Sequence, residues 1–146
     1  MFSAFKLSRP QISIFHSPSS PPSVAALNLL RSALSGPYPP NTKSQPLSFN
    51  LEVIEDKPPT PDQLRTISGY LPSASPDFFI SSHPTVDTRP TSADAVNKLA
   101  AKNPKALKWP IVVDWSSGRA AVGDVEGVKR ILEELRKQEN SKAWVR

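Results

Sequence analysis

Proline is the residue that most restricts how this chain can fold. It occurs 17 times in 146 residues, more than twice its usual share of roughly 5%, whereas glycine occurs only five times. Because proline fixes its own φ angle and has no backbone N–H to donate, it interrupts the interior of helices and strands. This composition predicts stiff connecting loops around a modest core rather than flexible glycine-rich linkers. The length favours a single domain.

Between the prolines, the spacing of apolar residues predicts alternating strands and helices. The clearest signal is a strand at 47–53, in which apolar residues alternate with polar ones, so that one face should be buried. Thr60, followed by a proline and then by Gln63, is typical of a capped helix start. The expected elements are a strand at 12–15, a helix at 24–34 capped by Ser23, the strand at 47–53, a helix from Thr60 to Leu71, a helix capped by Thr91 or Ser92 and ending at Lys102, strands at 109–115 and 119–122, and a helix capped at 123–124 with an apolar face from Val125 to Leu135.

This order of elements predicts an α/β fold with one small mixed sheet. The strand–helix–strand start implies a parallel pair, and the turn at 116–118 implies an antiparallel hairpin at the end. With helices on both faces of the sheet, this is the order of a thioredoxin-like sandwich. We expect residues 12–136 to form the domain, after a short basic lead or targeting segment at 1–11 and before a polar tail at 137–146. A loop of 19 residues at 72–90 is long enough to indicate a site or an insertion.

The chain contains no cysteine and only two histidines, His16 and His83. Without cysteine there can be no disulfide, thiolate zinc site, iron–sulfur cluster or cysteine nucleophile. The two histidines are far apart in the sequence, so a histidine metal site is not expected. The apolar stretches are much shorter than the roughly 20 residues that a membrane-spanning helix needs. We therefore expect no metal, no cofactor and no transmembrane segment.

The net charge of +5 is distributed unevenly. No acidic residue precedes Glu52, and this first stretch contains four basic residues and eleven serines. Such a composition is typical of a mitochondrial presequence. We expect a mitochondrial location with the signal minimally trimmed or retained; the alternative is a cytoplasmic protein whose first residues are only a lead-in. The densest basic group, Lys98 to Lys108, contains no aromatic residue, so nucleic-acid binding is not expected.

Two segments resemble a known family. They are ISIFHSPSSPPSVAALNLL at 12–30 and WPIVVDWSSGRAAVGDVEGVKRIL at 109–132. Both resemble the fungal mitochondrial "putative redox protein" family, and they are similar to the arsenate-reductase branch of the thioredoxin fold. The resemblance implies a mitochondrial oxidoreductase concerned with the reduction of small toxic molecules. It also implies a fold in which Pro110 is a cis-proline beside the active-site loop.

The same resemblance implies where a site would lie. Ser20 stands at the position of the related reductases' nucleophilic cysteine, and His16 is close enough in sequence to assist it or merely to satisfy a backbone partner. The backbone before a cis-proline at Pro110 would be free to pair with a peptide or a glutathione-like ligand. Trp109 and Asp124 stand where the reductases have arginines. The expected ligand-binding residues are His16, Ser20, Trp109 and Pro110, and no catalytic residue is assigned.

Two functions from different classes follow. The first is a mitochondrial redox protein that has lost its own redox chemistry with its cysteine, so that its status as an oxidoreductase rests on the resemblance alone. The second is a non-catalytic module that binds a peptide or partner in the cis-proline groove. A serine hydrolase built on Ser20 is disfavoured, because the chain has no Gly-x-Ser-x-Gly motif and no set of residues for a triad. The expected partner is a small molecule or peptide, not nucleic acid.

Overall fold

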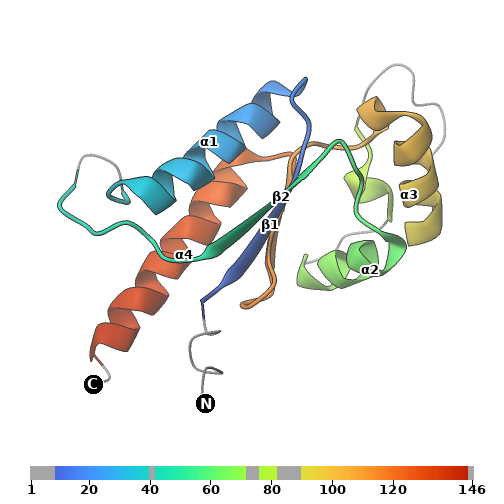
Figure 1. The fold of residues 1–146 in the computed structure, drawn as a ribbon. Helices are drawn as coiled ribbons and strands as arrows, with labels where there is room; N and C mark the ends of the chain where they lie inside the picture. The colour runs from blue at the N-terminus through green and yellow to red at the C-terminus, as the bar shows by residue number, and fades with distance from the viewer. Residues whose placement is uncertain (1–8, 40–41, 72–75, 82–89, 145–146) are drawn as a thin grey trace, which may run out of the picture.

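A four-stranded mixed sheet forms the centre of the structure (Figure 1). The structure, a computed structural model, describes residues 9–39, 42–71, 76–81 and 90–144. The strands are β1 (Gln11–His16), β2 (Asn50–Glu55), β3 (Ile111–Asp114) and β4 (Arg119–Val122), in the spatial order β2-β1-β3-β4. β1 pairs with β2 in parallel and with β3 antiparallel, and β3 pairs with β4 antiparallel. The predicted parallel start and antiparallel end are both present.

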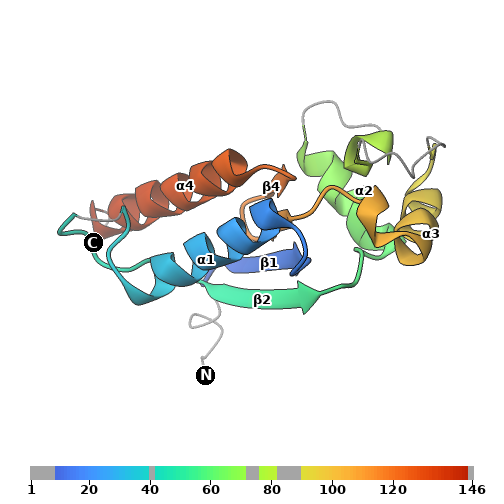
Figure 2. The same ribbon diagram turned by 90° about the horizontal axis from the view of Figure 1, so that it is seen from above.

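Helices cover both faces of this sheet (Figure 2). α1 (Pro21–Ser35) and α4 (Val125–Trp144) lie on one face, and α2 (Pro61–Tyr70) and α3 (Ala93–Lys102) lie on the other. Alternation along β1 separates two cores, because Ile12 and Ile14 pack with α1 and α4 whereas Phe15 packs with α2 and α3. The predicted α/β sandwich is confirmed. No helix in the described part of the chain is long and apolar enough to cross a membrane.

The helix starts show one confirmed prediction and one correction. At α2, the capping box is formed: the Gln63 N–H donates to Thr60 Oγ1 over 3.1 Å, and the Thr60 N–H donates to Gln63 Oε1 over 2.9 Å. Helix α1 begins at Pro21 instead of residue 24, because its cap is Ser20 and not Ser23. Proline suits the first helical positions, where an N–H would have no partner in the helix. Ser23 lies fully buried in the first turn.

Strand β2 differs from its prediction in position and in burial. The strand was expected at 47–53 with one buried face, yet it occupies Asn50–Glu55 and none of its residues is buried. The apolar residues that gave the signal, Leu47 and Phe49, lie in the core but before the strand. The Leu47 N–H donates to the Ala33 carbonyl over 2.8 Å, so this segment is held against the last turns of α1. Because β2 is an edge strand, the helices cover its faces only in part.

Two segments that were expected to be irregular contain helical turns. In the loop at 72–90, η2 (Pro76–Phe79) is followed by Ile80, which forms a bridge with Leu107 just after η3 (Pro104–Ala106). Phe79 and Ile80 are buried, so this apolar pair anchors the loop. The tail expected at 137–146 is helical as far as Trp144 because α4 continues through it. Residues 1–8 of the lead, and 72–75 and 82–89 of the loop, lie outside the described residues.

Gly127 allows α4 to lie directly against β4. A Cβ atom at this position would lie 2.7 Å from the Cβ of Ala121, too close for two carbon atoms. We therefore expect Gly127→Ala to lower the free energy of unfolding by about 1–3 kcal/mol, as overpacking usually does. Gly69 in α2 is the matched control, since an added Cβ there would meet nothing within 4 Å. Gly69→Ala should raise the free energy of unfolding by about 0.5–1 kcal/mol. Urea unfolding measures both, and similar effects in the two variants would contradict the close packing.

Candidate functional site

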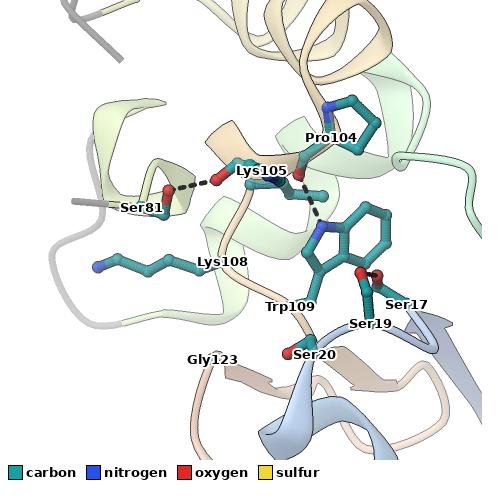
Figure 3. Close-up of a pocket in the computed structure, with 10 residues that line it drawn as sticks. Ser17, Ser19, Ser20, Ser81, Pro104, Lys105, Lys108, Trp109 and Gly123 are labelled. Carbon is teal, nitrogen blue, oxygen red and sulfur yellow. Dashed lines mark hydrogen bonds between the residues drawn. The ribbon is translucent and has the colours of Figure 1, made fainter. Parts of the chain in front are cut away.

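A pocket of about 690 Å³ opens between the start of α1 and the segment that leads into β3 (Figure 3). This volume lies within the usual range for ligand sites, about 300–1,000 Å³. The loop between β1 and α1, the end of the η2 segment, the η3 region and the turn after β4 all contribute to its wall. The lining residues are Ser17, Ser19, Ser20, Ser81, Pro104, Lys105, Leu107, Lys108, Trp109 and Gly123. We call it the Trp109 pocket.

Trp109 forms an apolar wall of the pocket. Its side chain is nearly buried, with 8% of its surface exposed, and its indole N–H donates to the Pro104 carbonyl over 2.7 Å. This bond is drawn in Figure 3 and fixes the orientation of the ring. The peptide bond between Trp109 and Pro110 is cis. Pro110 itself is buried and does not line the pocket.

The start of α1 offers the pocket no free backbone N–H. The Ser20 N–H donates to the Ser17 carbonyl over 3.1 Å, and Pro21 and Pro22 have no N–H to donate. The Ser23 N–H is taken by the Ser20 hydroxyl at 3.4 Å, and Val24 makes the first bond within the helix. A helix start normally binds anions through these N–H groups. Here that mode of binding is removed, and Ser20 lines the pocket as a helix cap.

His16 is buried and bonded elsewhere. Its Nδ1 lies 2.6 Å from the Ser23 hydroxyl, which also accepts a hydrogen bond from the Ser17 N–H over 3.0 Å. The His16 carbonyl accepts from the Asp56 N–H over 2.9 Å. His16 does not line the pocket, and within the described ranges no hydrogen bond joins it to Ser20. Of the four expected ligand-binding residues, the pocket therefore brings together Ser20 and Trp109 only.

Sequence reasoning missed two lysines in the pocket wall. Lys105 is exposed on η3. The half-buried Lys108 has its ammonium group 4.7 Å from the centre of the Phe78 ring, and its stem packs against Gly123. The basic group at 98–108 was visible in the sequence, but the lysines that reach the pocket are set by the η3 turn. None of the described residues that line the pocket is acidic.

Among the described residues, the groups that oxyanion chemistry or metal chemistry would need do not come together around this pocket. Asp124, which stands where the resemblance places an arginine, caps α4 by accepting from the Glu126 N–H over 2.9 Å. A carboxylate there suits a helix N-terminus and repels an anion. Among the residues that the structure describes, no cluster of histidine, aspartate and glutamate could hold a metal ion. The arrangement suits binding by hydroxyl groups, an aromatic ring and lysine ammonium groups.

The Ser23 hydroxyl joins the end of β1 to α1, and its removal should be costly. We expect Ser23→Ala to lower the free energy of unfolding by about 1–3 kcal/mol, because it leaves His16 Nδ1 and the Ser17 N–H without this partner in a buried corner. Ser19→Ala is the control, since Ser19 is exposed and its hydroxyl bonds to that of Ser17. It should change stability by less than about 0.5 kcal/mol. Chemical unfolding compares the two, and an equal loss in both would count against the role of Ser23.

Solved structures and one protein family match this chain. An arsenate reductase from Vibrio cholerae superposes with a TM-score of 0.58 at 21% identity, over 86% of this chain and 98% of that one. The structure described as "Putative arsenate reductase from Yersinia pestis" gives 0.53 at 22% identity, over 84% and 98%. These likenesses show an arsenate-reductase-like form of the thioredoxin-like fold. No curated protein matches. A family model described as "Protein of unknown function (DUF1687)" matches residues 2–123, most of the chain, and the protein therefore belongs to the DUF1687 family.

Proposed function

We propose that this chain is a mitochondrial redox-family protein, concerned with small toxic molecules, that binds its ligand in the Trp109 pocket without a thiol of its own. One observation carries the proposal. The pocket lies at the start of α1 and beside Pro110, where the resemblance places a reductase site, yet this chain supplies neither a cysteine nor a free helix N–H there. Ligand binding is what these residues support.

Thiol chemistry by the protein itself is not supported. A reductase of this kind needs a nucleophile that is acidic enough to ionise and N–H groups that hold the oxyanion. Ser20 provides a weakly acidic hydroxyl, and such a hydroxyl needs an adjacent base to act as a nucleophile. His16 does not serve as that base, because it is buried outside the lining of the pocket and, among the described residues, no hydrogen bond joins it to Ser20.

The features that recognise a ligand are nevertheless present. Trp109 offers an aromatic face that is held in place by its bond to Pro104. Ser17, Ser19 and Ser20 place hydroxyl groups along one wall, as Figure 3 shows. Pockets that bind small molecules typically combine an apolar wall with a few well-placed polar groups. This combination supports a small molecule or short peptide as the ligand.

In a second candidate function, the protein takes part in a redox reaction, and the ligand supplies the thiol instead of the protein. The fold shared with two arsenate reductases favours it. In this scheme a glutathione-like molecule occupies the pocket and brings the sulfur. Two such thiols would become one disulfide as a small oxidised molecule takes up two electrons. The protein would then orient the reactants and take no covalent part.

A coupled assay separates the two candidates. We expect the purified chain to reduce arsenate no faster than the background reaction with glutathione or a dithiol, because the protein has no cysteine. Ser20→Cys should also remain at background, since Pro21 and Pro22 still withhold the N–H groups that would bind an oxyanion. The Vibrio cholerae reductase serves as the positive control. Turnover by the unaltered chain would overturn the binding-only proposal and support the second candidate.

The mitochondrial location is a separate part of the proposal. It rests on the acid-free first stretch, in which Lys6 and Arg9 supply positive charge. We expect a fusion of residues 1–30 to a fluorescent reporter to localise to mitochondria. The same fusion with Lys6→Glu and Arg9→Glu should remain in the cytosol, because import signals need that charge. A diffuse signal from both the unaltered fusion and the full-length protein would remove the assignment.

A further inference from the structure

We propose that Lys105 and Lys108 make the Trp109 pocket selective for a short, peptide-like ligand that carries a carboxylate. The inference rests on the proposed function and adds the chemical class of the ligand. It assigns the recognition of negative charge to two lysines and not to the start of α1.

The charge of the pocket wall is positive. Two lysines line it, and none of its described lining residues is acidic. The nearest acidic neighbour in sequence to a lining residue is Asp124, next to Gly123, and its Oδ1 is engaged by the Glu126 N–H over 2.9 Å. An anionic ligand would therefore meet two lysine side chains along the wall, with the Asp124 carboxylate beside Gly123 as the nearest opposing charge in the sequence.

Lys108 is already held in place before any ligand binds. A Cβ atom added at Gly123 would come within 3.1 Å of the Lys108 Cβ, so the lysine stem lies directly on the turn after β4. At its other end, the ammonium group lies 4.7 Å from the centre of the Phe78 ring. The stem of Lys108 is thus fixed in the pocket wall, and its ammonium group lies at the Phe78 ring beyond the lining residues.

The start of α1 leaves the lysines as the donors for an anion. The N–H groups of Ser20 and Ser23 are bonded within the loop and the cap, and Pro21 and Pro22 have none. A small oxyanion that depends on such N–H groups is therefore not favoured here. A carboxylate can instead be bound by ammonium groups, which act as flexible point charges.

The volume of the pocket and its other lining residues indicate how large the ligand is and what it contains besides a carboxylate. Its volume of about 690 Å³ is that of a site for a molecule larger than a tetrahedral oxyanion. Trp109, Leu107 and Pro104 form an apolar surface against which a peptide plane or side chain can lie. The serine hydroxyl groups on the facing wall can accept from or donate to peptide groups. A short acidic peptide has a carboxylate for the lysines, an apolar part for the surface around Trp109, and peptide groups for the serine hydroxyls.

The test measures binding of S-methylglutathione, a tripeptide with two carboxylates and no free thiol, by isothermal titration calorimetry. We expect it to bind the unaltered chain, and we expect the Lys105→Met, Lys108→Met double variant to bind it at least about tenfold more weakly. The matched control is Lys98→Met with Lys102→Met. These two lysines are exposed on α3, do not line the pocket and lower the net charge by the same amount. Affinity should change by less than about twofold in the control.

A form of the ligand without carboxylates completes the design. The diethyl ester of S-methylglutathione keeps the peptide but not the carboxylates, and it should bind the unaltered chain at least about tenfold more weakly. Equal binding of ester and acid, or equal loss in both lysine pairs, would overturn the lysine assignment and leave the pocket as a binding site. Binding of neither compound to the unaltered chain would overturn the inference and count against the proposed function too. The urea midpoint of each variant establishes that it is folded.

Discussion

The other elements of this structure depend on strand β1. It pairs along both of its edges, and every residue from Ile12 to His16 is buried. Its two faces supply residues to two separate cores, so the helices on both sides of the sheet pack against the same short segment. At its end, the hydroxyl of Ser23 bonds to the His16 ring and to the Ser17 N–H. The loop that follows is thus fixed along the pocket because the strand and the first turn of α1 are fixed to each other.

The start of α1 departs from thiol chemistry in its side chain and in its backbone. Ser20 carries a weakly acidic hydroxyl where the resemblance places a cysteine, and Pro21 and Pro22 have no N–H to donate to an anion. Together they leave a polar wall of serines opposite a fixed indole ring. The site is therefore a pocket lined by hydroxyl groups and an aromatic ring, with no thiol and with no free N–H at Ser20 to Ser23.

Features that depend on neighbouring residues could be predicted from the sequence, and those that depend on distant contacts could not. The Thr60–Gln63 capping box and the turn at Gly118, with its φ of 71°, are set within a few residues. The position of β2 is different. The segment before this strand is held by a hydrogen bond from the Leu47 N–H to the carbonyl of Ala33, which lies 14 residues earlier in α1. Of the residues that line the pocket, Ser20 and Trp109 were predicted from the resemblance. Lys108 was not, since its place in the wall depends on its packing against Gly123.

The packing of helix α4 bears on which residues of this protein fold together as one unit. The segment that the family model matches stops at residue 123, and α4 begins at Val125. Yet Val128, Ile131 and Leu132 belong to the same buried cluster as the residues on one face of β1. A chain that stopped at the matched boundary would leave part of that face in water, at a cost of about 25 cal/mol for each Å² of apolar surface. The buried cluster of this protein therefore extends beyond the segment that the family model matches, and it includes α4.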